Sequence, residues 1–162
     1  MRVSLRLGVA SVLVGTALML APGSAFADQS YHTDHLRVSL TQAGAVAGYP
    51  QLTAGFVNDI HTQGPINFAV EDYLLNGAKP NTTYQVVLLL QAADCAGQFL
   101  FPFANGASVV TDAQGNGHNQ LKITPAQVTA LGLHNTNLGI RWSFVAGSTA
   151  AYLSECSNVH ID

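Results

Sequence analysis

Charged side chains are scarce in this 162-residue sequence, where Asp, Glu, Lys and Arg together make up 9% of the residues. Nine acids lie after residue 27, and the same part of the chain has four cations: Arg37, Lys79, Lys122 and Arg141. Four scattered cations cannot form the basic surface that contacts nucleic-acid phosphates or an anionic membrane. The composition therefore predicts a protein that binds neither nucleic acid nor a charged lipid surface.

The apolar run near the N-terminus is too short to cross a bilayer. It extends over residues 7–20, whereas a transmembrane helix needs about 20 apolar residues. Arg2 and Arg6 precede the run, and the small residues of Ala25-Phe26-Ala27 follow it in the positions that a signal peptidase recognises. The pattern predicts a signal peptide at residues 1–27 and a secreted chain that does not insert into the membrane.

Sulfur-containing residues are few as well. Both methionines lie within the predicted signal peptide, and the cysteines are Cys95 and Cys156. Cys156 and His160 have a Cys-x3-His spacing, but a blue-copper site would also use an axial methionine, which residues 28–162 lack. Two cysteines in an exported chain predict one disulfide. It would close a loop of about 60 residues and contribute about 4 kcal/mol to stability.

The remaining residues, 28–162, are predicted to form a single domain. Residues 35–41 and 66–71 alternate between apolar and polar with a period of two, as half-buried strands do. In the second segment the alternation predicts Val70 on the buried face and Glu71 on the exposed face. Further strands are predicted at residues 84–90, 99–101, 107–111, 120–123, 140–145 and 151–159.

One short helix is predicted near residues 125–131. Thr124 can cap it, Pro125 suits its first position, and Gln127 completes a capping box. Gly132 offers a stop. Many short strands separated by turn residues, with a single helix, predict an all-β antiparallel β-sandwich.

The segment TDAQGNGHNQLKIT, residues 111–124, is either a cation site or a turn. Calcium takes six to eight oxygen ligands, and Asp112 and Asn116 are too few to supply them. Asn116 and Gly117 both tolerate a positive φ and lie between two predicted strands, which predicts a hairpin turn. Asp112 is expected to accept hydrogen bonds from the amides of that turn.

The segment LLNGAKPNTTYQVVLLL, residues 74–90, resembles the L-x-P-x-T-x-Y-x-V segment of fibronectin type III and related immunoglobulin-like domains. In those domains a tyrosine hydrogen-bonds back across the preceding turn, an arrangement called the tyrosine corner. The resemblance implies an immunoglobulin-like β-sandwich in which Pro80 shapes the turn and Tyr84 is the corner residue. As a whole, the chain resembles small exported bacterial β-sandwich proteins, which implies a fold and no catalytic residues.

Motifs for catalysis and metal binding are sparse. No serine lies in a G-x-S-x-G motif, and the neighbouring acids Glu71 and Asp72 would point to opposite faces of a strand. The densest group of metal-ligating residues is His32, Asp34 and His35, which suit Zn or Cu(II). The other histidines share no spacing that would converge on one ion.

The sequence therefore predicts a secreted, non-enzymatic binding protein without a cofactor. Its partner would be an extracellular protein or a wall polymer, contacted through the loops at residues 44–53, 92–98 or 133–137. Tyr49 is the candidate aromatic contact, although it can also pack on its own domain. Two alternatives remain open: a metal-binding protein using the His32 group, and a small hydrolase with a histidine, an acid and a hydroxyl in one pocket.

Overall fold

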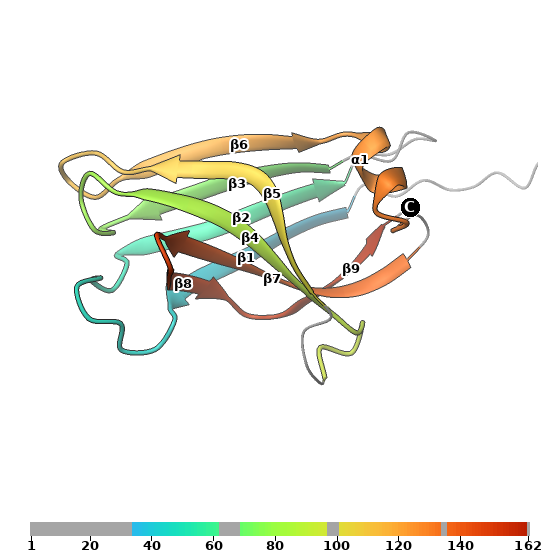
Figure 1. The fold of residues 1–162 in the computed structure, drawn as a ribbon, viewed down its shortest axis with the longest axis horizontal. Coiled ribbons are helices and arrows are strands. Elements are labelled where there is room, and N and C mark those ends of the chain that lie inside the picture. Colours follow the sequence, from blue (N-terminus) through green and yellow to red (C-terminus); the bar gives the residue numbers. More distant parts are fainter. Residues whose placement is uncertain (1–33, 62–68, 97–100, 134–135, 162) are drawn as a thin grey trace, which may run out of the picture. The chain divides into compact units, whose positions relative to one another are not determined.

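The computed structural model describes residues 34–61, 69–96, 101–133 and 136–161. Nine strands and one helix lie within these ranges (Figure 1). No helix there is long and apolar enough to cross a membrane. The elements are β1 (Asp34–Gln42), β2 (Ala54–His61), β3 (Ala69–Asn76), β4 (Thr83–Gln91), β5 (Phe101–Val110), β6 (Gly117–Ile123), α1 (Pro125–Ala130), β7 (Thr136–Ala146), β8 (Thr149–Ser154) and β9 (Ser157–Ile161).

The strands pair in the order β5-β4-β7-β8-β1-β2-β3-β6, and β9 pairs with β7. Every pairing is antiparallel. The end strands β5 and β6 also lie near each other, because the Asn119 side chain on β6 donates a 2.6 Å hydrogen bond to the Ser108 carbonyl on β5. The fold is thus an all-β, nearly closed antiparallel sheet, as Figure 1 shows.

The inner faces of the strands form one apolar core. Its largest fully buried side chains include Trp142, Tyr73, Tyr84, Tyr152 and Phe144. They come from β3, β4, β7 and β8, so the core joins strands that are distant in sequence. Edge-to-face contact between aromatic rings, such as Tyr73 and Phe144 at 5.9 Å between centroids, adds to the area they bury.

The helix has the capping that the sequence predicts. The Thr124 hydroxyl accepts a hydrogen bond from the Gln127 amide, and the Gln127 side chain accepts one from the Thr124 amide at 2.8 Å. Val128 is buried, and Gly132 follows the helix with φ of +65°. These contacts satisfy amides that the first turn of a helix leaves without partners.

Several strands differ from the prediction. The sequence did not indicate β2. Residues 101–110 form one strand, β5, which contains most of the strand predicted at residues 107–111. Residues 99 and 100 of the other predicted strand lie outside the described ranges. The single strand predicted at residues 151–159 is two, β8 and β9, because a break separates the part that pairs with β1 and β7 from the part that pairs only with β7. Strand boundaries depend on pairing partners, which a local pattern does not contain.

The assignment of faces on β3 is wrong. Glu71 points into the core and is 2% exposed, whereas Val70 is only half-buried. Alternation identifies two faces but not which one is buried, and a glutamate is normally placed outside. Here the Glu71 carboxyl group accepts hydrogen bonds from core side chains, and Val70 faces partly outward.

The turn at residues 111–116 is organised by Asp112, as predicted. Its Oδ1 accepts hydrogen bonds of 2.8 Å from the amides of Gln114 and Asn116. The positive φ, however, is at Gly115 (+79°), and not at Asn116 or Gly117. A Cβ at Gly115 would lie 2.1 Å from the Ala78 carbonyl oxygen, so the close approach of a second loop selects glycine there. The turn therefore lies just before Asn116, and Gly117 is the first residue of β6.

Candidate functional site

Two acids lie side by side in the core. Asp59 on β2 and Glu71 on β3 are directly opposite in the antiparallel register, and they are 3% and 2% exposed. Opposed side chains on one face of a sheet have Cβ atoms about 5 Å apart. Two negative charges at that separation repel, and burial raises the cost of each charge. A pair of this kind persists only where protons or hydrogen bonds compensate it.

Glu71 receives hydrogen bonds from three side chains. Trp142 Nε1 donates to Oε1 at 3.0 Å, Asn105 Nδ2 donates to Oε2 at 2.9 Å, and the Tyr73 hydroxyl also donates to Oε2. Burial, and next the charge of Asp59, raise the pKa of Glu71 from 4.5 to about 7, although the three donors oppose this. Glu71 therefore changes charge near neutral pH.

Asp59 continues the polar network toward the surface. Its Oδ2 lies 3.1 Å from His61 Nε2, and His61 Nδ1 lies 3.0 Å from the backbone carbonyl of His160. A carbonyl oxygen only accepts, so His61 Nδ1 carries a proton. A second proton lies between His61 Nε2 and Asp59 Oδ2. The other oxygen, Asp59 Oδ1, is buried and has no hydrogen-bond partner among the described residues.

A cavity of about 400 Å³ opens at this point. Asp59 and His61 line one side, and residues of β7 and β9 line the other. His160 is held there by a 2.9 Å contact between its Nδ1 and Asn137 Oδ1. The described residues that line it are Leu36, Asp59, His61, Asn137, Asn158, Val159 and His160. We call this space the Asp59 cavity.

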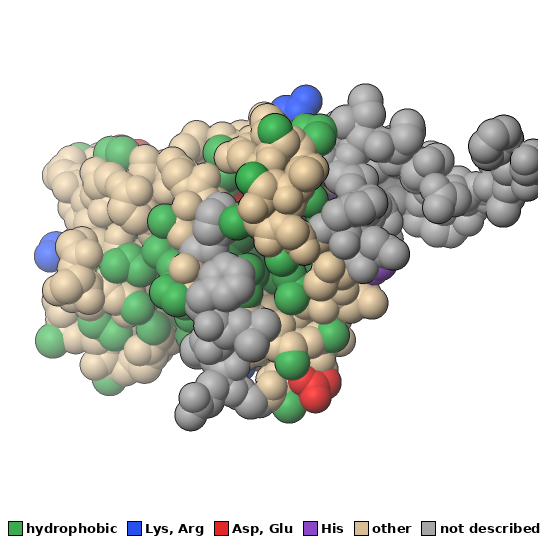
Figure 2. Space-filling model, turned by 45° about the vertical axis from the view of Figure 1, so that its right-hand side comes forward, with side chains coloured by type: hydrophobic (Ala, Val, Ile, Leu, Met, Phe, Trp, Pro, Cys, Tyr) green, Lys and Arg blue, Asp and Glu red, His purple; other side chains and the backbone are tan. Residues whose placement is uncertain are grey.

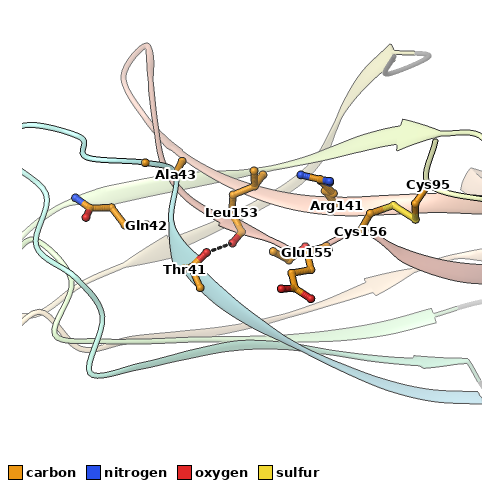
Figure 3. Close-up of a pocket in the computed structure, with 10 residues that line it drawn as sticks. Thr41, Gln42, Ala43, Cys95, Arg141, Leu153, Glu155 and Cys156 are labelled. Carbon is orange, nitrogen blue, oxygen red and sulfur yellow. Dashed lines mark hydrogen bonds between the residues drawn. A yellow bond between two sulfur atoms is a disulfide. The ribbon is translucent and has the colours of Figure 1, made fainter. Parts of the chain in front are cut away.

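A second hollow lies beside the disulfide (Figure 3). It is an open groove of about 610 Å³ between the end of β1 and the β8–β9 connection. Arg141 and Glu155 both line it, so its charges are of opposite sign, and Thr41 Oγ1 donates to the Leu153 carbonyl at 3.4 Å. The Asp59 cavity, with its buried acid pair, is chemically more selective than this groove.

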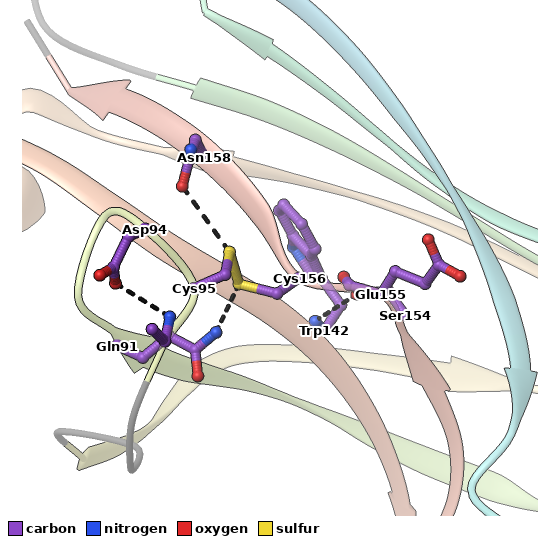
Figure 4. The surroundings of a disulfide bond; sticks show 9 residues. Gln91, Asp94, Cys95, Trp142, Ser154, Glu155, Cys156 and Asn158 are labelled. Atoms are coloured by element: carbon purple, nitrogen blue, oxygen red, sulfur yellow. Dashed lines mark hydrogen bonds between the residues drawn. A yellow bond between two sulfur atoms is a disulfide. The ribbon is translucent and has the colours of Figure 1, made fainter.

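The predicted disulfide is present in the structure. Cys95 and Cys156 are bonded, and their Cα atoms are 5.9 Å apart, inside the range that such bonds require. The bond lies next to the side chains of Gln91 and Asn158 (Figure 4). Because disulfide sulfurs carry no proton, Asn158 is a packing neighbour of Cys95 here and not a hydrogen-bond acceptor from it.

The disulfide crosses over β7. Gly139 on β7 pairs with Gln91 of β4 on one side and with Asn158 of β9 on the other. A Cβ at Gly139 would lie 2.5 Å from the Ala92 carbonyl oxygen and 3.0 Å from the Cys156 sulfur. The bond therefore links the strands on both sides of β7, and glycine leaves the room that it needs.

The predicted metal group is only partly within the described residues. His32 lies outside them, and the backbones of Asp34 and His35 belong to β1, where they pair with His61 and Ile60. Within the described ranges, no three His, Cys, Asp or Glu side chains come together as they would around a metal ion.

Tyr49 is half-buried, and its ring packs edge-to-face on Tyr84 at 6.3 Å between centroids. Lys79 Nζ lies 5.0 Å from the centre of the Tyr49 ring, on its face. This is the packed arrangement that the sequence left as the alternative to an exposed contact. The binding role of Tyr49 stays a prediction.

Tyr84 is fully buried, and its ring also lies 5.5 Å from that of Tyr152. Burial and the Tyr152 hydroxyl raise the pKa of Tyr84, and the Lys79 backbone lowers it. Among the described residues, the Tyr84 hydroxyl nevertheless has no partner within normal hydrogen-bond geometry. The Lys79 backbone is therefore a neighbour of the Tyr84 hydroxyl and not its hydrogen-bond partner. Tyr84 is a buried core residue that follows the turn containing Pro80.

Sequence reasoning missed the residues of the Asp59 cavity. Asp59 and His61 lie on β2, which was not predicted, and Glu71 was assigned to the outer face. The one available signal was the alternation Val57, Asp59, His61, which places an acid and a histidine on one face of a strand. Asn137 belongs to residues 133–137, which the sequence indicated as a binding loop, but the structure places it on β7.

The surface carries few charged groups, and Figure 2 shows a face that is mainly polar uncharged or hydrophobic. No protein-family model matches the sequence, and no curated protein or solved structure matches the chain. The class that the fold defines is an all-β protein with a nearly closed antiparallel sheet and one disulfide.

Proposed function

We propose that the chain is an exported, non-enzymatic binding protein that holds its ligand in the Asp59 cavity. The observation that carries this proposal is a cavity of about 400 Å³ that Asp59 and His61 line, next to the buried pair of Asp59 and Glu71. A ligand with polar groups can hydrogen-bond to the side chains that line such a cavity.

The size and position of the cavity support this proposal. Ligand pockets start at about 300 Å³ and combine apolar walls with a few polar groups. Leu36 and Val159 supply apolar walls here, and the polar groups are held on strands, which position them more rigidly than loops do. A small molecule, or the end group of an extracellular protein or wall polymer, fits this volume.

Binding is favoured over catalysis by the state of His61. Both of its ring nitrogens are engaged, Nε2 by Asp59 and Nδ1 by the His160 carbonyl. A general base needs a free nitrogen within reach of the group that it deprotonates. Among the described residues, those that line the cavity include an acid and two histidines but no serine, threonine or cysteine.

Export and the immunoglobulin-like sandwich are parts of the same proposal. The disulfide supports export, because such bonds persist in oxidising compartments, and it agrees with a signal peptide at residues 1–27. The pairing of β1 supports two layers: residues 34–39 pair with β2, and residues 40–42 pair with β8. Strands that change sheets in this way form the corners of β-sandwiches.

A ligand screen with a blocked cavity tests the proposal. Small polar fragments are screened by saturation-transfer NMR against the oxidised protein and two variants. Asn158→Trp places a large ring at the cavity, and Ser39→Trp adds the same ring to an exposed position of β1 outside it. We expect fragments that bind the wild type and Ser39→Trp but not Asn158→Trp.

Two outcomes contradict the proposal. One is the absence of any fragment that binds the wild type. The other is a set of fragments that bind Asn158→Trp as well as they bind the wild type, which would place the ligand site elsewhere on the protein.

A further inference from the structure

The inference concerns the ligand class of the Asp59 cavity, and it rests on the proposed function. We propose that the ligand is an extended peptide segment of another protein, which adds to the sheet as a strand along the outer edge of β9. Alternate side chains of that segment would enter the cavity. Three features of the described residues support this: the strand edges at the cavity, the direction of the backbone groups of β9, and the charge of the lining.

Two strands part at the cavity. Residues 40–42 of β1 pair with β8, but residues 34–39 pair with β2 alone. The chain runs on from β8 into β9, and β9 pairs with β7 alone. Among the described residues, the first half of β1 and the whole of β9 therefore each have one edge that no strand covers. Leu36 on β1 and Val159 on β9 both line the cavity, which places it between these two strands.

One contact shows which backbone groups of β9 face its outer edge. In antiparallel strands the N–H and C=O of one residue point to the same side, and successive residues alternate between the two sides. The carbonyl of His160 points away from β7, because it lies 3.0 Å from His61 Nδ1 on β2. The N–H and C=O of Asn158, two residues earlier, point to the same side. Asn158 therefore offers one donor and one acceptor to an added strand.

The edge of β9 lacks the usual features that prevent pairing. Edge strands are commonly protected by lysine, proline or a bulge. Residues 157–161 contain no lysine or proline, their register with β7 has no shift, and Asn158 is exposed. Recognition of peptides by sheet edges draws its affinity from main-chain hydrogen bonds of this kind. A sugar chain lacks the regular alternation of N–H and C=O groups that would match the edge.

The lining of the cavity favours an uncharged peptide. His61 Nδ1 carries a proton and a second proton lies between His61 Nε2 and Asp59 Oδ2, so this pair has no net charge. The described residues of the lining include no lysine or arginine. Asn137 and Asn158 supply side-chain amides, which both donate and accept. We expect uncharged polar side chains at the peptide positions that face the cavity.

Amide hydrogen exchange with selected peptides tests the inference. Random heptapeptides displayed on phage are selected against the oxidised protein, and the peptide recovered most often is synthesised. Exchange of the Asn158 amide proton should slow at least tenfold when this peptide is bound, because the amide then donates to the added strand. Exchange at Gly147, in the turn between β7 and β8, should not change.

Two substitutions at one position form a matched pair for calorimetry. Asn158→Pro removes the N–H that faces the outer edge and no hydrogen bond to β7, a change that edge strands tolerate. Asn158→Ala removes the side chain and keeps that N–H. Asn158→Pro should bind the peptide at least tenfold more weakly than Asn158→Ala. Equal affinities in the two folded variants, or unchanged exchange at Asn158 in the wild type, would overturn the inference.

The same measurements identify other occupants of the edge. Slower exchange at Asn158 with rising protein concentration alone would assign the edge to a second copy of the chain and overturn the inference. Binding of chitotriose but of no heptapeptide would also overturn it. If small polar fragments bind the cavity and no peptide protects Asn158, this inference fails and the proposed function stands. If neither fragments nor peptides bind, both fail.

Discussion

Replacing Glu71 by Gln should change how the stability of the protein depends on pH. In the unfolded chain the carboxyl releases its proton near its ordinary pKa of 4.5, but in the folded protein it does so near 7. Between these values the folded state holds one more proton than the unfolded state. The free energy of unfolding therefore decreases as pH rises, and the loss is complete above the folded pKa.

The size of the effect follows from the two pKa values. A rise from 4.5 to about 7 corresponds to about 3 kcal/mol. The difference in unfolding free energy between wild type and Glu71→Gln should thus fall by about 3 kcal/mol from pH 4.5 to pH 7.5. Urea unfolding at several pH values measures it, and subtracting the variant removes the contribution of the other acids.

Asp72→Asn is the matched control for this experiment. Asp72 is the next residue on β3, and its carboxylate accepts a 2.7 Å hydrogen bond from Gln120 on the outer side. This variant should keep the pH dependence of the wild type. A wild-type-minus-Glu71→Gln difference that stays constant over this pH range would refute the assignment of a buried, protonated Glu71.

Three further predictions concern the core and the disulfide. Replacing Cys95 and Cys156 by Ser should lower the free energy of unfolding by about 4 kcal/mol, given their separation of 61 residues, and the unreduced wild type should be about 2 Da lighter than its thiol form. Gly139→Ala should lower the free energy of unfolding by about 1–3 kcal/mol, because its Cβ would meet a carbonyl oxygen at 2.5 Å. Gly147→Ala meets nothing within 4 Å and should lower it by about 1 kcal/mol because of its positive φ. Chemical denaturation compares the two variants. Trp142→Phe removes an indole donor to the buried carboxyl and should move the midpoint of the pH dependence upward, as urea unfolding across pH would show.

The parts of the fold that sequence predicted are those that local chemistry determines. The capping box of Thr124 and Gln127, the Asp112 turn and the first half of β1 depend on residues close in sequence. The disulfide was predictable because two cysteines allow one pairing. Its course over Gly139 was not, since it depends on β7 lying between β4 and β9.

The candidate site could not be predicted because its residues come together through long-range pairing. Glu71 is buried only because Trp142, which lies 71 residues away in the chain, and Asn105 supply hydrogen bonds to it. Its neighbour Asp59 is on a strand whose pattern mixes polar and apolar residues on the inner face. A rule that places acids outside fails wherever the core contains such donors.

Amide chemical-shift mapping during titration with a small polar fragment from the ligand screen tests the account of the binding site most directly. The spectrum of the oxidised protein would be recorded at pH 8 with increasing ligand. The account predicts the largest changes at the Asp59 cavity, in His61, Asn137 and Asn158. Largest changes at the groove near Thr41 and Leu153, or no localised changes at all, would contradict it.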